Sequence, residues 1–227
     1  MTLYSTLFQA VQGHTMIPEE RFIENLRCVE WLRKQSDFPD GTIVECGVWR
    51  GGMAVSFMKL FGPTRIYRLF DSFDGLPPPS NNDGEDAMWW HSHPEHPRFY
   101  NNCKAAREDV ETLISRVLAP GFQVEIHKGW FSDSLFIADA QPIAFLHLDC
   151  DWYDSIMQCL TILWPAILPG GGIIIDDYYD WEGCRRAVHD FLSRHRAREA
   201  IERVGVSGGA FIRRRGPWQL SESPHLW

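Results

Sequence analysis

The sequence lacks the signatures of several protein classes. No apolar stretch approaches the roughly 20 residues of a membrane-spanning helix, and the N-terminus does not show the basic-then-apolar order of a signal peptide. The six cysteines form no Cys-x-x-Cys pair, so the sequence contains neither a zinc-knuckle motif nor a thioredoxin-like motif. Positive charge is scarce: 22 Lys and Arg against 30 Asp and Glu give a formal charge of −8, which disfavours nucleic-acid binding. We therefore expect a cytoplasmic protein that binds neither membranes nor nucleic acids.

The composition is that of a globular α/β protein. Hydrophobic residues make up 44% and charged residues 23% of the 227 positions, and at roughly 150 residues per domain we expect a single domain spanning residues 1–227. Short β-rich runs alternate with helical periodicities, which predicts parallel strands joined by helices. The predicted strands are Thr42 to Cys46, Arg65 to Phe70, Phe122 to His127, Ile143 to Asp149 and Gly172 to Ile175, followed by an antiparallel pair between Ala200 and Arg215.

Glycine and acidic residues follow the first two predicted strands. The segment 45–52, Glu-Cys-Gly-Val-Trp-Arg-Gly-Gly, is neither a Walker A loop nor a Gly-x-Gly-x-x-Gly motif, and an ordinary strand-to-helix turn would also explain it. Asp71, at the next strand end, could accept hydrogen bonds from both hydroxyls of a ribose. Because open α/β sheets bind ligands at the carboxyl ends of their strands, the two features together predict a site for a nucleoside cofactor.

Four carboxylates follow two later strands: Asp149 and Asp151 after one, Asp176 and Asp177 after the next. Such crowding is unfavourable unless a cation is bound or some of the acids are protonated. Hard carboxylate oxygens favour Mg²⁺, Mn²⁺ or Ca²⁺ over zinc. Some of these aspartates could instead cap the helices that follow, but capping does not account for all four. We therefore predict a metal site.

Several motifs recur in order between residues 15 and 178. They are Thr15-Met-Ile17, Glu45-Cys-Gly-Val48, Asp71-Ser-Phe-Asp-Gly-Leu-Pro77, Gly129-Trp-Phe-Ser-Asp-Ser-Leu135, Asp149-Cys-Asp-Trp-Tyr-Asp-Ser155 and Gly170-Gly-Gly-Ile-Ile-Ile-Asp-Asp-Tyr178. Together they resemble the macrocin O-methyltransferase family of metal-dependent sugar methyltransferases that use S-adenosylmethionine. The motifs beginning at Asp71 and Asp149 are the specific ones, whereas the glycine loop alone is not.

The resemblance implies a Rossmann-like class I methyltransferase: a mostly parallel seven-stranded sheet with an antiparallel C-terminal strand and helices on both faces. It also implies a homo-oligomer and a sugar acceptor, either the deoxysugar of a natural product or a glycan sugar. The site residues that it implies are Thr15, Met16, Glu45, Gly47, Asp71, Ser72, Trp130 and Phe131 for S-adenosylmethionine, Asp149, Asp176 and Asp177 for Mg²⁺ or Mn²⁺, and Asp151 as the general base.

These roles agree with the chemistry of a sugar hydroxyl, which is a poor nucleophile until its proton is removed. Asp151 lies two residues from Asp149, so both could border one pocket if the strand stays extended, and Cys150 would then point to the other side. His147, within the same strand, is expected to be a core histidine whose hydrogen bonds are satisfied.

Residues between Ser72 and Tyr100 break the pattern, and long irregular segments in compact domains are commonly functional lids. We predict that residues about 75–101 form a lid over the acceptor, in which Trp89 or Trp90 stacks on a sugar, with a helix from Cys103 to Leu118 after it. Three histidines in this segment do not predict zinc, because His-x-His in a proline-rich loop is more often solvated.

Other interpretations stay open. A metal-dependent glycosyltransferase could use Asp149-x-Asp151, although the glycine loop and Asp71 argue against it. A methyltransferase for a non-sugar hydroxyl, of the catechol type or independent of metal, shares the cofactor, and a non-catalytic binding protein would not need the clustered acids.

Overall fold

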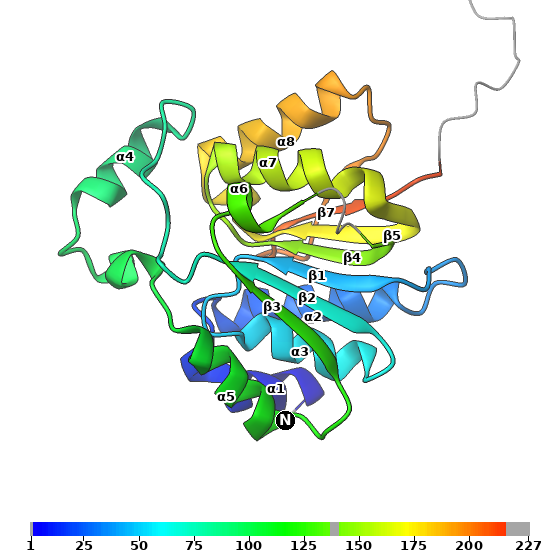
Figure 1. The fold of residues 1–227 in the computed structure, drawn as a ribbon. Helices are drawn as coiled ribbons and strands as arrows, with labels where there is room; N and C mark the ends of the chain where they lie inside the picture. Colours follow the sequence, from blue (N-terminus) through cyan, green and yellow to red (C-terminus); the bar gives the residue numbers. More distant parts are fainter. Residues whose placement is uncertain (1, 137–140, 217–227) are drawn as a thin grey trace, which may run out of the picture.

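The computed structural model, which describes residues 2–136 and 141–216, contains a seven-stranded sheet with helices on both faces (Figure 1). The strand order is β3-β2-β1-β4-β5-β7-β6, in which the first five strands are parallel and β7 is antiparallel to both of its neighbours. This confirms the predicted sheet with its antiparallel C-terminal strand. The strands are β1 (Thr42–Cys46), β2 (Ile66–Asp71), β3 (Gln123–Lys128), β4 (Ile143–Leu148), β5 (Ile167–Ile175), β6 (Ile201–Arg203) and β7 (Ala210–Arg213).

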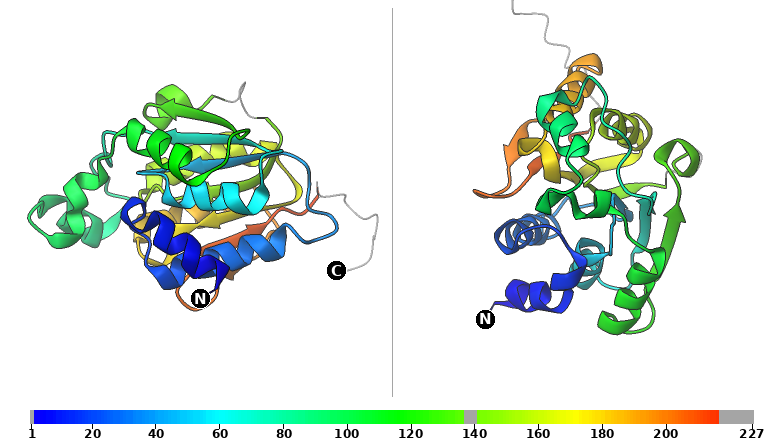
Figure 2. Two further views of the ribbon diagram at one scale, coloured as in Figure 1. Left: turned by 90° about the horizontal axis from the view of Figure 1, so that it is seen from below. Right: turned by 90° about the vertical axis from the view of Figure 1, so that its left-hand side faces the viewer.

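Two hydrophobic cores lie on opposite faces of the sheet. Helices α1, α2, α3 and α5 cover one face, and α7 and α8 cover the other (Figures 1 and 2). Among the described residues no helix is both long and apolar enough to cross a membrane. The helices are α1 (Leu3–Val11), η1 (Gln12–His14), α2 (Glu19–Leu32), α3 (Gly52–Phe61), α4 (Gly84–Ser92), η2 (Pro97–Cys103), α5 (Arg107–Val117), α6 (Phe131–Ser134), α7 (Tyr153–Leu163), η4 (Trp164–Ala166), η5 (Asp176–Tyr179) and α8 (Glu182–Arg194).

Two predicted element boundaries were wrong. The strand predicted from Gly172 begins earlier, at Ile167, because Pro165 lies in a short 3-10 turn that ends the preceding helix, and the chain is extended from Ile167 through Pro169. The helix predicted from Cys103 begins only at Arg107, since Tyr100 to Cys103 have positive φ between 49° and 57° and cannot continue a right-handed helix.

Residues 75–101, here called the insert, project beyond the carboxyl ends of the parallel strands (Figure 1 and the left view of Figure 2). The insert contains α4, which the hydrophobic pattern did not predict. Its two ends are held together by Asn102: the amide of Leu76 donates to the Asn102 carbonyl oxygen (3.1 Å), and the Asn102 side chain donates to the Leu76 carbonyl oxygen (2.8 Å). Gly75 is required at this neck, because it has φ +92° and a β-carbon there would lie 2.2 Å from the Asn102 oxygen.

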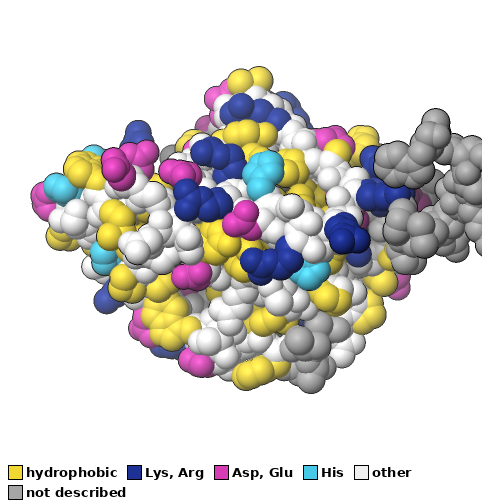
Figure 3. Space-filling view, turned by 90° about the horizontal axis from the view of Figure 1, so that it is seen from above, with side chains coloured by type: hydrophobic (Ala, Val, Ile, Leu, Met, Phe, Trp, Pro, Cys, Tyr) yellow, Lys and Arg dark blue, Asp and Glu magenta, His cyan; other side chains and the backbone are white. Residues whose placement is uncertain are grey.

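The surface above α7 and α8 carries basic and acidic side chains interspersed with one another (Figure 3). The insert stands out at one side of this view and carries hydrophobic, acidic and histidine side chains. Three of its large hydrophobic residues, Met88, Trp89 and Tyr100, are about half exposed. The functional site lies between the insert and the strand ends.

Candidate active site

A cavity of about 890 Å³ lies at the carboxyl ends of the strands, bordered by the insert. Every residue that the sequence analysis assigned to the site lines this one cavity, although the residues come from segments spread over most of the chain. They are Thr15, Met16, Glu45, Gly47, Asp71, Ser72, Trp130, Phe131, Asp149, Asp151, Asp176 and Asp177.

The glycine loop after β1 is fixed by the Asp71 carboxylate at the end of β2. One oxygen accepts hydrogen bonds from the backbone amides of Val48 (2.7 Å) and Trp49 (2.8 Å), and the other accepts from the amide of Phe73 (2.6 Å). Burial raises the pKa of Asp71, while these three amides act to lower it. The side chain therefore organises the loop, a role that the sequence did not reveal, and Oδ1, which accepts one hydrogen bond, keeps lone-pair capacity for a ligand hydroxyl.

Gly47 brings the loop against the neighbouring strand end. Its φ is +84°, and a β-carbon at this position would lie 1.7 Å from the carbonyl oxygen of Asp149. Any side chain would push β1 and β4 apart at the cavity floor. Glycine here keeps the loop and the first acidic segment in contact.

Glu45 and His147 form a buried pair on β1 and β4. The His147 Nδ1 atom lies 2.8 Å from Glu45 Oε1, and both side chains are almost fully buried. Burial raises the pKa of Glu45, opposed by the hydrogen bond and charge of His147. His147 lies in the core as predicted, but the prediction that its hydrogen bonds are satisfied was wrong. Its Nε2, like Glu45 Oε2, is buried without a hydrogen-bond partner among the described residues.

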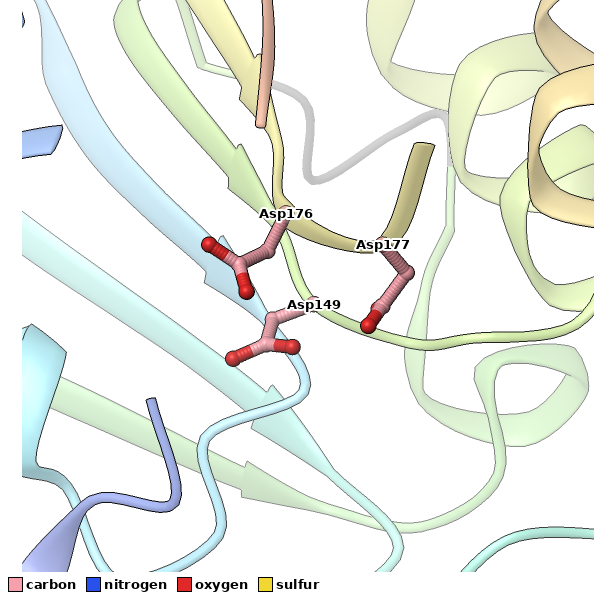
Figure 4. Close-up of side chains that lie close together, drawn as sticks. All are labelled: Asp149, Asp176 and Asp177. Carbon is pink, nitrogen blue, oxygen red and sulfur yellow. The ribbon is translucent and has the colours of Figure 1, made fainter. Parts of the chain in front are cut away.

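Three carboxylates converge at the ends of β4 and β5 (Figure 4). Asp149, Asp176 and Asp177 each offer an oxygen, and these oxygens all lie within 4.8 Å of one another. Asp176 also accepts from Arg21 (3.2 Å) and from the side-chain amide of Asn25 (2.8 Å). Three hard oxygen donors at this spacing fit a divalent ion such as Mg²⁺.

Asp151 lies beside this cluster on a tight turn. The strand ends at Leu148, and Asp151 has φ +56°, so the premise of an extended chain was wrong, although Asp149 and Asp151 still border one cavity. Its amide donates to Asp177 Oδ2 (3.2 Å), and its Oδ1 accepts from the indole N–H of Trp181 (2.9 Å). Cys150 is buried in the core under α7 and α8, but it also lines the cavity, so the predicted separation of its side from that of the aspartates is not seen.

Electrostatics favour a cation or bound protons in this cluster. Burial and the neighbouring carboxylates raise the pKa values of Asp149 and Asp177 well above the ordinary value. Burial likewise raises the pKa of Asp151 to about 7, although the hydrogen bond from Trp181 acts to lower it. The cluster is therefore not stable as four unscreened charges.

Residues outside the recognised motifs complete the site. Arg21, on α2, binds both Asp176 and Asp180 and also donates to the Ser207 carbonyl oxygen, so it provides a positive charge at the cluster. Asp83, in the insert, accepts a hydrogen bond from the amide of Tyr153 at the start of α7 (2.6 Å). The amphipathic spacing of α2 was the only sequence signal for the direction in which Arg21 points. No local sequence pattern indicated a role for Asp83.

The capping alternative for the aspartates is wrong. The residues at the N-caps of α7 and α8 are Trp152 and Trp181, and no aspartate of the cluster caps either helix among the described residues. The cap of α7 comes instead from Asp83, which lies far away in the sequence.

Comparison with known proteins decides the family. Residues 8–214 match the macrocin O-methyltransferase (TylF) family. The chain belongs to the TylF family. Membership identifies an O-methyltransferase with the class I Rossmann-like fold, which confirms the resemblance seen in the motifs and rejects the glycosyltransferase interpretation.

Relatives of this TylF-family chain include 8-demethyl-8-(2,3-dimethoxy-α-L-rhamnosyl)-tetracenomycin-C 4′-O-methyltransferase of Streptomyces olivaceus, 34% identical over 86% of this chain and 74% of the relative. Mycinamicin III 3″-O-methyltransferase of Micromonospora griseorubida is 32% identical over 86% of this chain and 77% of its own. Among solved structures, the O-methyltransferase NovP superposes with a TM-score of 0.73 at 27% identity, covering 89% of this chain and 83% of NovP.

Proposed function

We propose that this enzyme transfers a methyl group from S-adenosylmethionine to a sugar hydroxyl, with a bound Mg²⁺ and with Asp151 as the general base. The observation that carries the proposal is the meeting of three carboxylate oxygens within 4.8 Å in the same cavity as the glycine loop and Asp151. Each part alone has other uses, but their combination suits metal-assisted transfer to an oxygen nucleophile.

The cavity can hold the cofactor along its glycine-loop side. We assign the methionine end to Thr15, Met16 and the segment Glu45 to Gly47, the ribose to Asp71 and Ser72, and the adenine to Trp130 and Phe131. Trp130 is 40% exposed and its ring is thus available to a flat ligand. S-adenosylmethionine supplies a methyl group that its sulfonium already activates, so the protein needs mainly to align donor and acceptor.

The acidic cluster supports the other half of the reaction. Asp149, Asp176 and Asp177 would hold the ion, which supplies positive charge where the acceptor oxygen loses its proton. Asp177 has one oxygen engaged by the Asp151 amide and one left for the ion. Asp151 has Oδ1 engaged by Trp181, which leaves Oδ2 to accept the proton of the hydroxyl.

A sugar acceptor follows from the relatives and suits the cavity. The relatives' names describe methylation of a rhamnosyl group on tetracenomycin and of mycinamicin III. The insert contributes Trp89, Trp90 and Tyr100 to the cavity wall. Of these, Trp89 and Tyr100 are about half exposed, and exposed aromatic faces pack against the C–H faces of sugars. We therefore infer that the insert is the acceptor lid and that the acceptor is a deoxysugar on a larger natural product.

Methyl transfer from labelled S-adenosylmethionine to glycosides and to the matching aglycones tests the proposal. We expect methylation of the glycosides alone, and its loss when EDTA removes the metal. Asp149→Asn should raise the Mg²⁺ concentration needed for activity by roughly 10- to 100-fold, whereas Asp154→Asn, which changes an exposed carboxylate on α7, should not.

Calorimetric titration with S-adenosylhomocysteine separates the two halves of the proposal. Binding of this product without any methylation of glycosides would refute the acceptor assignment, and full activity in EDTA would refute the metal. Full activity of Asp151→Asn would refute the base.

A further inference from the structure

Trp181 contacts both the proposed base and the insert, the first through its indole N–H and the second through its ring. Its indole N–H donates to Asp151 Oδ1 (2.9 Å), the single protein hydrogen bond to that carboxylate among the described residues. Its ring packs edge-on against Trp152 at 5.0 Å and against Trp90, which belongs to α4 of the insert, at 6.2 Å. The same side chain therefore contacts both the site and the insert.

These three tryptophans form the centre of a small hydrophobic cluster, which Trp181 joins to the sheet core under α7 and α8. Trp90 and Trp152 also contact each other at 5.8 Å, and both are almost fully buried. The indole N–H of Trp152 donates to the carbonyl oxygen of Pro77 in the insert (2.8 Å). The insert thus rests on the two tryptophans, Trp152 and Trp181, that follow the two acidic segments.

Asp83, which lies between Pro77 and Trp90 in the insert, fixes the insert to the same place by polar contacts. This carboxylate is only 1% exposed; one oxygen accepts from the Tyr153 amide (2.6 Å) and the other from the amide and hydroxyl of Ser80. It also fits against the first turn of α8, where a β-carbon on Gly183 would lie 2.2 Å from Asp83 Oδ1. A carboxylate beside the N-termini of two helices is stabilised by their amides and dipoles.

We propose that Trp181 is the positioning residue for Asp151 and that seating of the insert and orientation of the base are one coupled event. The proposal rests on the assignment of Asp151 as base in the previous section. When the insert is seated, Trp90 and Trp152 hold the Trp181 ring, and its N–H holds Oδ1 so that Oδ2 faces the acceptor. Displacement of the insert removes the Trp90 part of this support, so the ring, and with it the carboxylate, is held less firmly.

Trp181→Phe is the direct test, because it removes the N–H and keeps an aromatic ring in the cluster. We expect kcat to fall roughly 10- to 100-fold, the cost of a misplaced catalytic group, with KM for S-adenosylmethionine and affinity for S-adenosylhomocysteine little changed. Trp164→Phe is the matched control, since it alters a buried tryptophan at the far end of α7. Thermal unfolding of both variants shows whether they fold.

A double-mutant cycle with Asp83→Asn tests the coupling. Unseating the insert should lower kcat and speed amide hydrogen exchange over α4. Because the two residues act through one arrangement, the double variant should be no slower than the slower single variant. Trp181→Phe turnover equal to that of Trp164→Phe, or effects of the two changes that multiply, would overturn the proposal. Full activity of Asp151→Asn would instead show that the underlying base assignment has failed.

Discussion

The metal-free enzyme should lose stability as pH rises through neutrality. A carboxyl whose pKa is raised on folding stabilises the folded state below its unfolded pKa, and this contribution disappears as pH rises through the folded pKa. For Asp151 these values are 3.8 and about 7. At about 1.4 kcal/mol per pKa unit, the free energy of unfolding should fall by roughly 2 kcal/mol between about pH 5.5 and 8. For a chain of this length, that corresponds to a Tm decrease of roughly 4–8 °C.

Scanning fluorimetry in EDTA and in excess Mg²⁺, at steps across this pH range, measures the effect. Mg²⁺ binds the ionised cluster, so the Tm increase that it causes should be small at the acidic end and large at the alkaline end. The lowered pKa of His14, caused mainly by burial, acts in the opposite direction. Comparison with Asp151→Asn cancels this contribution, and the variant should show a shallower slope than the wild type. An EDTA-treated wild type whose Tm is flat or rises from acid to alkaline pH, relative to that variant, would refute the reasoning.

Three further changes have expected outcomes. Asp71→Asn removes the charged acceptor of the loop amides, at a cost of roughly 1.5–3 kcal/mol, so calorimetry should show about 10- to 100-fold weaker binding of S-adenosylhomocysteine; unchanged binding would contradict this. Gly47→Ala should destabilise the fold far more in urea than Gly62→Ala, because both have positive φ but a β-carbon at Gly62 meets nothing within 4 Å; equal costs would show that the close approach is unimportant. Arg21→Gln leaves a buried Asp176 without its cation and should cost roughly 3 kcal/mol in EDTA, with Mg²⁺ restoring part of the loss; identical losses in both buffers would argue against a metal at this cluster.

The sheet could be predicted because its strands are encoded locally. The almost continuous apolar run of β4 is typical of a central parallel strand, and every one of its residues is buried. The residues at the strand ends were likewise predictable, since the carboxyl ends of parallel strands meet at one edge. The apolar character of a strand and its burial depend on short stretches of sequence, and the structure confirmed both predictions for β4.

The rest of the site depends on contacts that no local pattern encodes. Arg21 reaches Asp176 across 155 positions of the chain, and Asp83 reaches the Tyr153 amide across 70. A carboxylate at position 83 resembles the exposed acids on either side of it until the fold brings α7 against it. The helix within the insert was missed for a related reason, since it packs against tryptophans from distant segments rather than against the sheet.

The insert packs around a small aromatic cluster that it shares with Trp152 and Trp181, and its cavity-lining side chains Trp89 and Tyr100 belong to neither core of the sheet. We therefore expect that residues such as Trp89 and Tyr100 can be exchanged among related enzymes without unfolding the scaffold, provided that Asp83 and Trp90 are kept. In this architecture, acceptor specificity would change through substitutions in the insert, while the proposed cofactor and metal residues beneath it stay the same.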